Sequence, residues 1–345
     1  IENCSIPVYY ANGELAHKKE NSYIIDERCK VSFDAVKREI DCVDVVSFDF
    51  YDTLVMRLVY SPGDILKVTE QRIRHELGRE IAFTELRTRA AAELEGREYG
   101  LDEIYQYMEK YIDQSICDRM KLLELDTEMK LTVARKDVAA LFHYAVETGK
   151  EVYILSDMYL AGETIKKIAA KCGIEVEKTN LWISCEIGKS KKNGGMWELF
   201  AQKNAGRKAI HFGDSLTGDE EKPRDAGIAA VHLPGPAELL RNSALVKITP
   251  YINSLHSSFT MGIILNELFN SPFAFENAGE ALEIKSCKSF GKCIFGDVTL
   301  TYLSKVLSGV RSQKIENLIF FARDGYFLKR DFDIFCKQIG ANVHS

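Results

Sequence analysis

The fold prediction rests first on residues 47–57, Ser47-Phe48-Asp49-Phe50-Tyr51-Asp52-Thr53-Leu54-Val55-Met56-Arg57. This stretch follows an apolar run at residues 43–46 and places Asp49 where a buried strand should end. In open α/β sheets, ligands bind in the crevice beyond the carboxyl ends of the strands. A carboxylate held there can act as a nucleophile or as a metal ligand. An apolar run that ends in Asp is common by itself, so the prediction depends on the strands that follow.

Four further apolar runs, at residues 150–155, 180–184, 208–212 and 229–233, are predicted to form strands. They alternate with helical patterns such as residues 162–172, which is typical of a parallel sheet. Right-handed crossovers bring the carboxyl ends of all these strands to one side of the sheet. We expect the following side chains to meet there: Asp49, Ser156, Lys191, Asp214 and Asp219.

These residue types favour phosphoryl transfer. Two or three carboxylates with a backbone carbonyl form an oxygen site that suits Mg²⁺, and a hydroxyl with an ammonium group orients and neutralises a phosphoryl group. An aspartate nucleophile divides the transfer into two steps through an aspartyl-phosphate. Each feature alone has a plainer interpretation, since Ser-Asp after a strand is commonly a helix N-cap and Gly-Asp-Ser a turn. All of them in this order indicate a catalytic site.

The chain resembles the haloacid dehalogenase (HAD) superfamily of Mg²⁺-dependent phosphatases and phosphotransferases. The resemblance covers about residues 41–235 and rests on residues 48–54, Ser156, a lysine and residues 213–219. It implies a doubly wound, Rossmann-like α/β core with a helical cap, and a small phosphorylated substrate.

The same resemblance implies roles for individual residues. Asp49 would be the nucleophile, with Thr53 beside it. The metal ligands would be Asp49, Asp214, Asp219 and the backbone carbonyl of Tyr51. The phosphate-binding residues would be Ser156, Asp157 and Lys191. We prefer Lys191 to Lys189 because it precedes the Asn193-Gly194 turn.

Tyr51 departs from the family pattern. Phosphatases of the family usually have a second Asp at this position as general acid and base, and Gly where this chain has Asp52. A tyrosine with a pKa near 10 is a poor proton shuttle at neutral pH, and loss of a general acid/base costs about 10²–10⁴-fold in rate. We therefore expect slow hydrolysis, or transfer to an acceptor other than water.

Two alternatives stay open. The true haloacid dehalogenases carry Tyr at this position and cleave carbon–halogen bonds without a metal, although that chemistry gives Asp214 no purpose. The other alternative is a binding or regulatory module that holds a metal and a phosphorylated ligand with little turnover.

A narrower resemblance concerns residues 47–57, 155–160 and 321–326. These strings are similar to a bacterial branch of predicted hydrolases, often fused or adjacent to glycosyltransferases of surface-polysaccharide synthesis. This implies a sugar phosphate, nucleotide sugar or lipid-linked sugar as substrate, and a glycosyltransferase as a partner or fused domain.

The predicted organisation has four parts: an N-terminal extension (1–40), an α/β core (41–60 and 146–235), a helical segment without strands (61–145), and a mainly helical C-terminal region (236–345). The position of the helical segment, between the first and second motifs, is where the superfamily carries its cap. Arg57 lies near the hinge of that segment. It could pair with a substrate phosphate or carboxylate, or form a surface salt bridge.

Outside the core, residues 9–13 read as a strand and turn and residues 33–40 as a helix. In the C-terminal region we expect helices at 237–245, 249–255 (with Pro250 at its first position), 262–270, 289–309 and 326–338. A buried strand is expected at 315–322, ending in Arg323-Asp324-Gly325. That end is either a second binding crevice or a turn with Asp324 as N-cap.

Composition narrows the class of protein. The 345 residues carry a formal net charge of −6, which argues against a nucleic-acid binder. No apolar run reaches the roughly 18 residues that a membrane span requires. Nine irregularly spaced cysteines suggest neither zinc nor disulfides, so we expect a cytoplasmic protein. Because the sequence begins at Ile1 rather than Met, we expect it to be a fragment of a longer chain.

Overall fold

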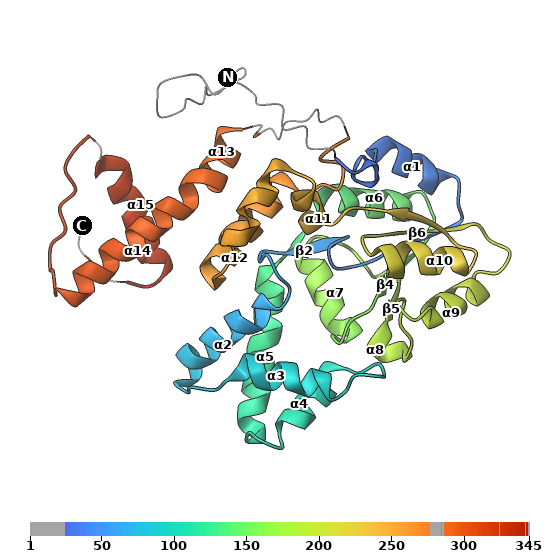
Figure 1. Cartoon of the computed structure of the whole chain (residues 1–345), viewed down its shortest axis with the longest axis horizontal. Helices are drawn as coiled ribbons and strands as arrows, with labels where there is room; N and C mark the ends of the chain where they lie inside the picture. Colours follow the sequence, from blue (N-terminus) through green and yellow to red (C-terminus); the bar gives the residue numbers. More distant parts are fainter. Residues whose placement is uncertain (1–24, 277–283, 285, 324, 342, 344–345) are drawn as a thin grey trace. The chain divides into compact units, whose positions relative to one another are not determined.

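The computed structural model describes residues 25–276, 284, 286–323, 325–341 and 343 (Figure 1). The chain divides into two compact units, Ile1–Glu283 and Ile284–Ser345. The boundaries expected at residues 61, 146 and 236 fall inside the first unit and stay predictions. The strand and turn expected at residues 9–13 lie outside the described residues.

The first unit is built on a parallel sheet with the strand order β5-β4-β1-β6-β7 (Figure 1). These strands are β1 (Val45–Phe48), β4 (Glu151–Ser156), β5 (Asn180–Ile183), β6 (Ala209–Gly213) and β7 (Ala229–His232). They lie at the five predicted runs, so the Rossmann-like α/β core is confirmed. Phe48 is in register with Ile154 of β4 and with Phe212 of β6. The strand order therefore reverses at β1, which is where open α/β sheets bind their ligands.

Helices cover both faces of the sheet, which explains why every residue of β1 is buried. Because successive side chains of a strand point to opposite faces, Val46 and Phe48 pack on one side and Val45 on the other. The first side is covered by α1 (Phe33–Asp41), α6 (Lys136–Glu147) and α7 (Gly162–Lys171). The second is covered by α9 (Gly195–Lys203) through Trp197 and Phe200. The remaining short elements are the 3₁₀ turn η1 (Glu27–Cys29), α8 (Ser184–Ile187), the π-helical turn η2 (Leu216–Glu221) and α10 (Lys222–Asp225).

The segment between the first two motifs is helical, as expected, but it is not free of strands. Its helices are α2 (Asp64–Leu77), α3 (Phe83–Ala92), α4 (Leu101–Met108) and α5 (Gln114–Leu131). The expectation of no strand was wrong, since β3 (Thr132–Ala134) pairs antiparallel with β2 (Val55–Arg57). Three residues are too few to show an alternating pattern, and β3 gains its backbone partners from a strand far away in the sequence. The pair joins the two ends of the helical segment at the sheet.

Three helical elements follow the last strand: α11 (Pro236–Arg241), the 3₁₀ helix η3 (Ala244–Tyr251) and α12 (Leu255–Leu268). The expected bounds need correction here. Pro250 lies inside η3 and opens no helix, and α12 begins earlier than predicted because the hydroxyl of Ser254 caps it by accepting from the Ser257 N–H. In α12, Gly262 packs against the backbone after β2, where a Cβ atom would lie 2.2 Å from the carbonyl carbon of Leu58.

The second unit consists of α13 (Cys287–Phe290), the π-helical turn η4 (Gly291–Phe295), α14 (Gly296–Ser312) and α15 (Gly325–Gln338). Its small core includes Leu303, Leu307 and Phe332. The expectation of a strand at residues 315–322 was wrong: the run has no regular strand structure. Its apolar residues Leu318 and Phe320 pack on the helical core instead. Asp324 lies outside the described residues, so its expected role as an N-cap stays a prediction.

Candidate active site

The predicted site residues converge at the carboxyl end of the sheet. Asp49 follows β1, Ser156 ends β4, Asp214 follows β6, and Asp219 lies in the turn η2. Lys191 comes from the loop after α8. All five line one pocket of about 520 Å³, together with the following residues: Tyr51, Arg57, Asp157, Met158, Lys192, Ser215, Thr217 and Gly218.

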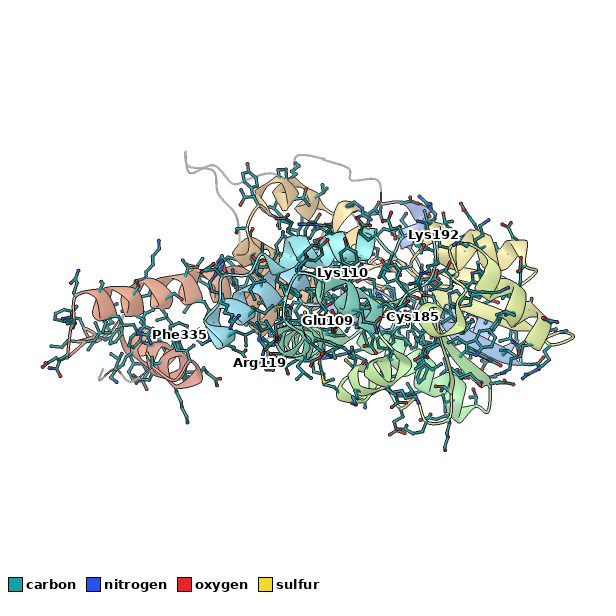
Figure 2. All side chains as sticks on the ribbon, turned by 90° about the horizontal axis from the view of Figure 1, so that it is seen from below. Glu109, Lys110, Arg119, Cys185, Lys192 and Phe335 are labelled. Atoms are coloured by element: carbon teal, nitrogen blue, oxygen red, sulfur yellow. The ribbon has the colours of Figure 1, made fainter. Side chains whose placement is uncertain are left out.

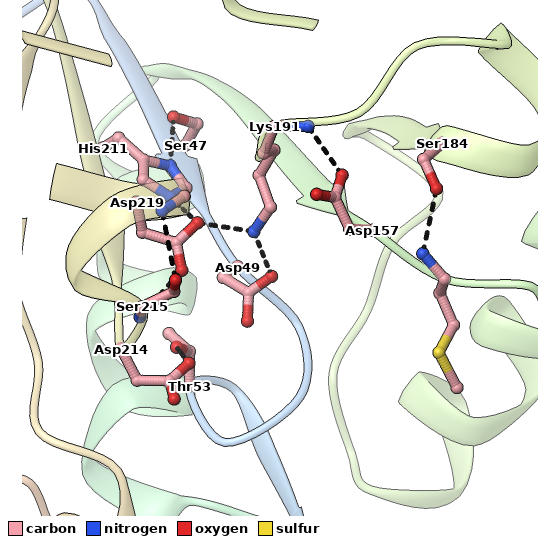
Figure 3. A network of polar contacts seen from close by, with 12 residues as sticks. Ser47, Asp49, Thr53, Asp157, Ser184, Lys191, His211, Asp214, Ser215 and Asp219 are labelled. Carbon is pink, nitrogen blue, oxygen red and sulfur yellow. Dashed lines mark hydrogen bonds and ion pairs between the residues drawn. The ribbon is translucent and has the colours of Figure 1, made fainter. Parts of the chain in front are cut away.

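A buried cluster of charges occupies the floor of this pocket (Figure 3). The Lys191 ammonium donates to Asp49 Oδ1 and, at 2.6 Å, to Asp219 Oδ1. Burial alone would lower the pKa of Lys191, but the charges of Asp219 and Asp49 raise it above its ordinary value. Burial raises the pKa of the Asp49 carboxyl, and the Lys191 charge opposes that effect. The structure therefore brings Lys191 to Asp49, whereas Lys189 is half-exposed near Glu198.

Asp214 completes a group of three carboxylates. Asp49, Asp214 and Asp219 each offer one oxygen atom, and these atoms lie within 4.8 Å of one another. Burial and then the charge of Asp49 raise the pKa of Asp214 well above its ordinary value. A divalent cation would offset this repulsion, and carboxylate oxygens are the ligands that Mg²⁺ prefers. The residues therefore fit the expected metal. The Thr53 hydroxyl, expected beside Asp49, donates to Asp214 Oδ1 at 3.3 Å.

The side of the pocket that is expected to bind phosphate is formed by the end of β4 and by the loop after α8. Ser156 is buried at the end of its strand. The Asp157 carboxylate accepts from the backbone N–H groups of Lys191 at 2.7 Å and of Lys192 at 3.0 Å. Asp157 therefore fixes the loop that carries Lys191. This contact gives it a positioning role beside the phosphate contact expected from the sequence.

Tyr51 packs its ring against the guanidinium group of Arg57. The guanidinium carbon of Arg57 lies 3.7 Å from the centre of the Tyr51 ring. The Tyr51 hydroxyl is buried and has no hydrogen-bond partner among the described residues. Burial, and next the negative charge of Glu128, raise its pKa well above 10. Tyr51 therefore cannot shuttle protons near neutral pH.

Arg57 forms a salt bridge with a residue of the helical segment. Its Nε atom donates to Glu128 Oε1 of α5 at 2.6 Å, and both side chains are largely buried, at 10% and 2% exposure. The salt bridge is therefore an interior one, unlike the exposed pair considered from the sequence.

Two residues that the sequence reasoning missed support the site. His211 of β6 is fully buried, with Nδ1 2.8 Å from the Ser47 hydroxyl and Nε2 3.2 Å from Asp219 Oδ1 (Figure 3). Burial lowers its pKa, so the ring is neutral at neutral pH and orients Asp219. The available signal was a histidine inside the apolar strand Ala-Ile-His-Phe-Gly.

The second is Arg135, whose guanidinium joins three backbone segments. It donates to the carbonyls of Asp52, of Pro234 at 2.9 Å and of Asn270 at 2.9 Å. Asp52 has a positive φ of 56°, a conformation that most side chains avoid. A glycine would adopt this conformation without strain. Arg135 holds this loop beside Asp214. No sequence pattern pointed to Arg135, because all three acceptors are backbone atoms.

Three solved structures are similar to part of this chain at low sequence identity. The chain is similar to an L-2-haloacid dehalogenase (16% identity, TM-score 0.42), covering 57% of this chain and 86% of the other. It is similar to a protein named as a HAD-hydrolase from Bacillus subtilis bound to magnesium (12%, TM-score 0.38, covering 54% and 86%). It is also similar to a predicted phosphoglycolate phosphatase from Haemophilus somnus (14%, TM-score 0.37, covering 54% and 83%). No family model and no curated protein sequence matches the chain. We therefore base its function on the geometry of the site.

Proposed function

We propose that the protein is a Mg²⁺-dependent phosphohydrolase or phosphotransferase that acts on a small phosphorylated metabolite through an aspartyl-phosphate at Asp49. The observation that carries this proposal is the Asp49 carboxylate at the reversal point of the sheet, held by Lys191 and facing Asp214 and Asp219. Such a site combines a nucleophile, a fixed positive charge and a set of hard oxygen ligands in one pocket.

The first chemical step is attack by an Asp49 carboxylate oxygen on the phosphorus atom of the substrate. A phosphorus–oxygen bond forms, and the bond to the leaving oxygen breaks, so that this oxygen departs as an alkoxide or phenoxide and takes a proton from water. In the second step the acceptor, water or an alcohol, attacks the phosphorus and loses its proton to the solvent, the bond from phosphorus to Asp49 breaks, and Asp49 regains its carboxylate. Lys191 and Ser156 orient the phosphoryl group, while His211 and the Ser215 N–H hold Asp219, the latter at 3.0 Å. Mg²⁺, held by Asp49, Asp214, Asp219 and the carbonyl of Tyr51, would neutralise charge on the phosphoryl oxygens.

The leaving group sets the rate in this mechanism. Tyr51 stands in place of an acidic residue, and its raised pKa makes it unsuited to exchange protons with the departing oxygen near neutral pH. Esters of acidic alcohols, which leave without a proton, should therefore react fastest. The same feature favours a second candidate, a module that binds a phosphorylated ligand with little turnover. The glycosyltransferase partner, the role in polysaccharide synthesis and the cytoplasmic location are proposals from resemblance alone.

The test is hydrolysis of an aryl phosphate by wild type and by Asp49→Asn, each with Mg²⁺ and with EDTA. We expect activity only in the wild type with Mg²⁺. Asp44→Asn serves as the control, because Asp44 lies at the other end of β1 and accepts from the Lys208 N–H. Activity that persists in Asp49→Asn would refute the nucleophile. Ligand binding without turnover in any arm would establish the second candidate.

A further inference from the structure

Three largely buried arginines in the first unit differ in how many of their guanidinium nitrogens donate hydrogen bonds within the chain. Arg135 donates from Nε and from both terminal nitrogens to backbone carbonyls. Arg87 donates to the Glu124 carboxylate from Nε and one terminal nitrogen. Arg57 donates to the chain through Nε alone, at Glu128. Within the described residues its two terminal nitrogens have no hydrogen-bond acceptor, so both are available to a ligand.

The two terminal nitrogens of Arg57 are accessible from the catalytic pocket. Neither terminal nitrogen belongs to the buried atoms that lack a partner, so each is reachable by solvent. The residue lines the same pocket as Asp49 and Lys191. Lys192, labelled in Figure 2, is exposed and lines this pocket too, which adds a second positive charge. The pocket therefore offers an anion two further groups besides the one that Lys191 supplies.

The position of Arg57 is fixed before any ligand arrives. Glu128 holds Nε at 2.6 Å, the Tyr51 ring lies 3.7 Å below the guanidinium, and β2 pairs Arg57 with Thr132 of β3. Glu128 also compensates the buried charge, without occupying the terminal nitrogens. A guanidinium fork held in this way loses little side-chain entropy on binding, and it matches the geometry of a carboxylate or phosphate group.

We propose that Arg57 binds a second anionic group of the substrate, so that the substrate class is a small phosphomonoester carrying a carboxylate or a second phosphate away from the reacting one. This inference rests on the proposed function. Asp49 and Lys191 engage the reacting phosphoryl group, and Arg57 engages the other end. A pocket of about 520 Å³ is of the size that takes small molecules.

Three compounds with one propane chain test the inference: 3-hydroxypropyl phosphate, 3-(phosphonooxy)propanoate and propane-1,3-diyl bisphosphate. They differ only in the far end, which is neutral, a carboxylate or a second phosphate. Binding is measured by calorimetry on the full chain carrying Asp49→Asn, and kcat and KM are measured on the chain with Asp49 intact. We expect at least one anionic compound to bind about 10- to 100-fold more tightly than the neutral one. The ratio between the two anionic compounds identifies which anion is preferred.

The variants separate the role of Arg57 from a general loss of structure. Arg57→Gln should remove the preference, and Arg57→Lys should retain part of it, because a lysine keeps the charge but not the fork. Arg87→Lys is the matched control, a buried arginine paired with a glutamate of α5 that does not line the pocket. It should keep the full preference. Circular dichroism confirms that each variant is folded.

Several outcomes would overturn the inference: equal binding of the three compounds, no binding of any of them, an unchanged preference in Arg57→Gln, or an equal loss in Arg87→Lys. A binding preference that depends on Arg57, in a protein that hydrolyses neither these compounds nor an aryl phosphate, would refute the proposed function and leave the anion-binding role of Arg57 standing.

Discussion

Asp49 depends on a small number of side chains from elements far apart in the sequence. Lys191 contacts it directly, and Asp219, which shares the Lys191 ammonium, is in turn oriented by His211. A lysine between two buried carboxylates stabilises their ionised forms, which the nucleophile requires. In the proposed mechanism, the reactivity of Asp49 therefore depends on these partners as well as on Asp49 itself.

Replacing Tyr51 tests the missing proton shuttle. Tyr51→Asp should raise the hydrolysis of alkyl phosphates by up to about 10²-fold, because the new carboxyl can protonate the leaving oxygen. Aryl phosphates, with acidic leaving groups, should gain much less. The control is Tyr51→Asn. Asn has nearly the size of Asp but cannot transfer a proton, so this variant should show no gain in alkyl phosphate hydrolysis. An equal gain in both variants would mean that removal of the ring, and not proton transfer, is responsible.

Lys191 and Lys189 lie in the same loop after α8, so replacing each of them separately tests which one acts in the site. Lys191→Gln should lower kcat/KM by about 10²–10³-fold, since it removes the charge that faces the phosphoryl group. Lys189→Gln should change it less than about twofold, because this side chain is half-exposed and only approaches Glu198 at 3.9 Å. Steady-state kinetics with one aryl phosphate compares them. Equal losses in both variants would contradict the role assigned to Lys191.

The elements around the site were predicted from the sequence to different degrees. The five parallel strands and the motifs at their ends were found because long apolar runs followed by Asp or Ser carry their own signal. β3 and the start of α12 were not found. β3 depends on a partner distant in the sequence, Val55–Arg57. The start of α12 is set by the cap at Ser254, which the apolar pattern used for the prediction does not mark. The strand expected at 315–322 was wrong, because within the described residues this run forms only an isolated bridge at Asn317. Leu318 and Phe320 pack on the helical core, while Ile319 and Phe321 are exposed.

The helical segment contains a buried ion pair whose removal should be costly. Arg87 of α3 and Glu124 of α5 are 3% and 2% exposed, and the Tyr105 hydroxyl donates to the same carboxylate at 2.8 Å. Arg87→Met should destabilise the first unit by about 3–5 kcal/mol, because Glu124 is left as an unpaired buried charge. The double variant Arg87→Met/Glu124→Leu should recover most of that loss.

Urea unfolding followed by circular dichroism measures these free energies of unfolding. The control is the exposed pair Glu85–Arg89 on α3, where Arg89→Met should cost less than about 1 kcal/mol. If Arg87→Met costs no more than Arg89→Met, the buried pair does not hold α3 on α5.

In the molecule as a whole, metal binding should be linked to folding. Three carboxylates, those of the buried Asp49 and Asp219 and of the partly buried Asp214, lie close enough to repel one another in the folded state, and the unfolded chain has no such cluster. Mg²⁺ at 100 times its Kd should therefore stabilise the first unit by about 2.7 kcal/mol. The midpoint of thermal unfolding should rise with Mg²⁺ in the wild type and not in Asp214→Asn. A rise of equal size in Asp214→Asn would place the ion elsewhere. No helix among the described residues is long and apolar enough to cross a membrane.

The central claim is that Asp49 carries the phosphoryl group during turnover. The measurement that tests it most directly is mass spectrometry of the protein quenched with acid while it hydrolyses an aryl phosphate in the presence of Mg²⁺. We predict a phosphoryl group on the peptide that contains Asp49, and its absence when EDTA replaces Mg²⁺ or when Asp49→Asn replaces the wild type. Turnover with no phosphoryl group on Asp49 under rapid quench, or with the group on another residue, would contradict the mechanism.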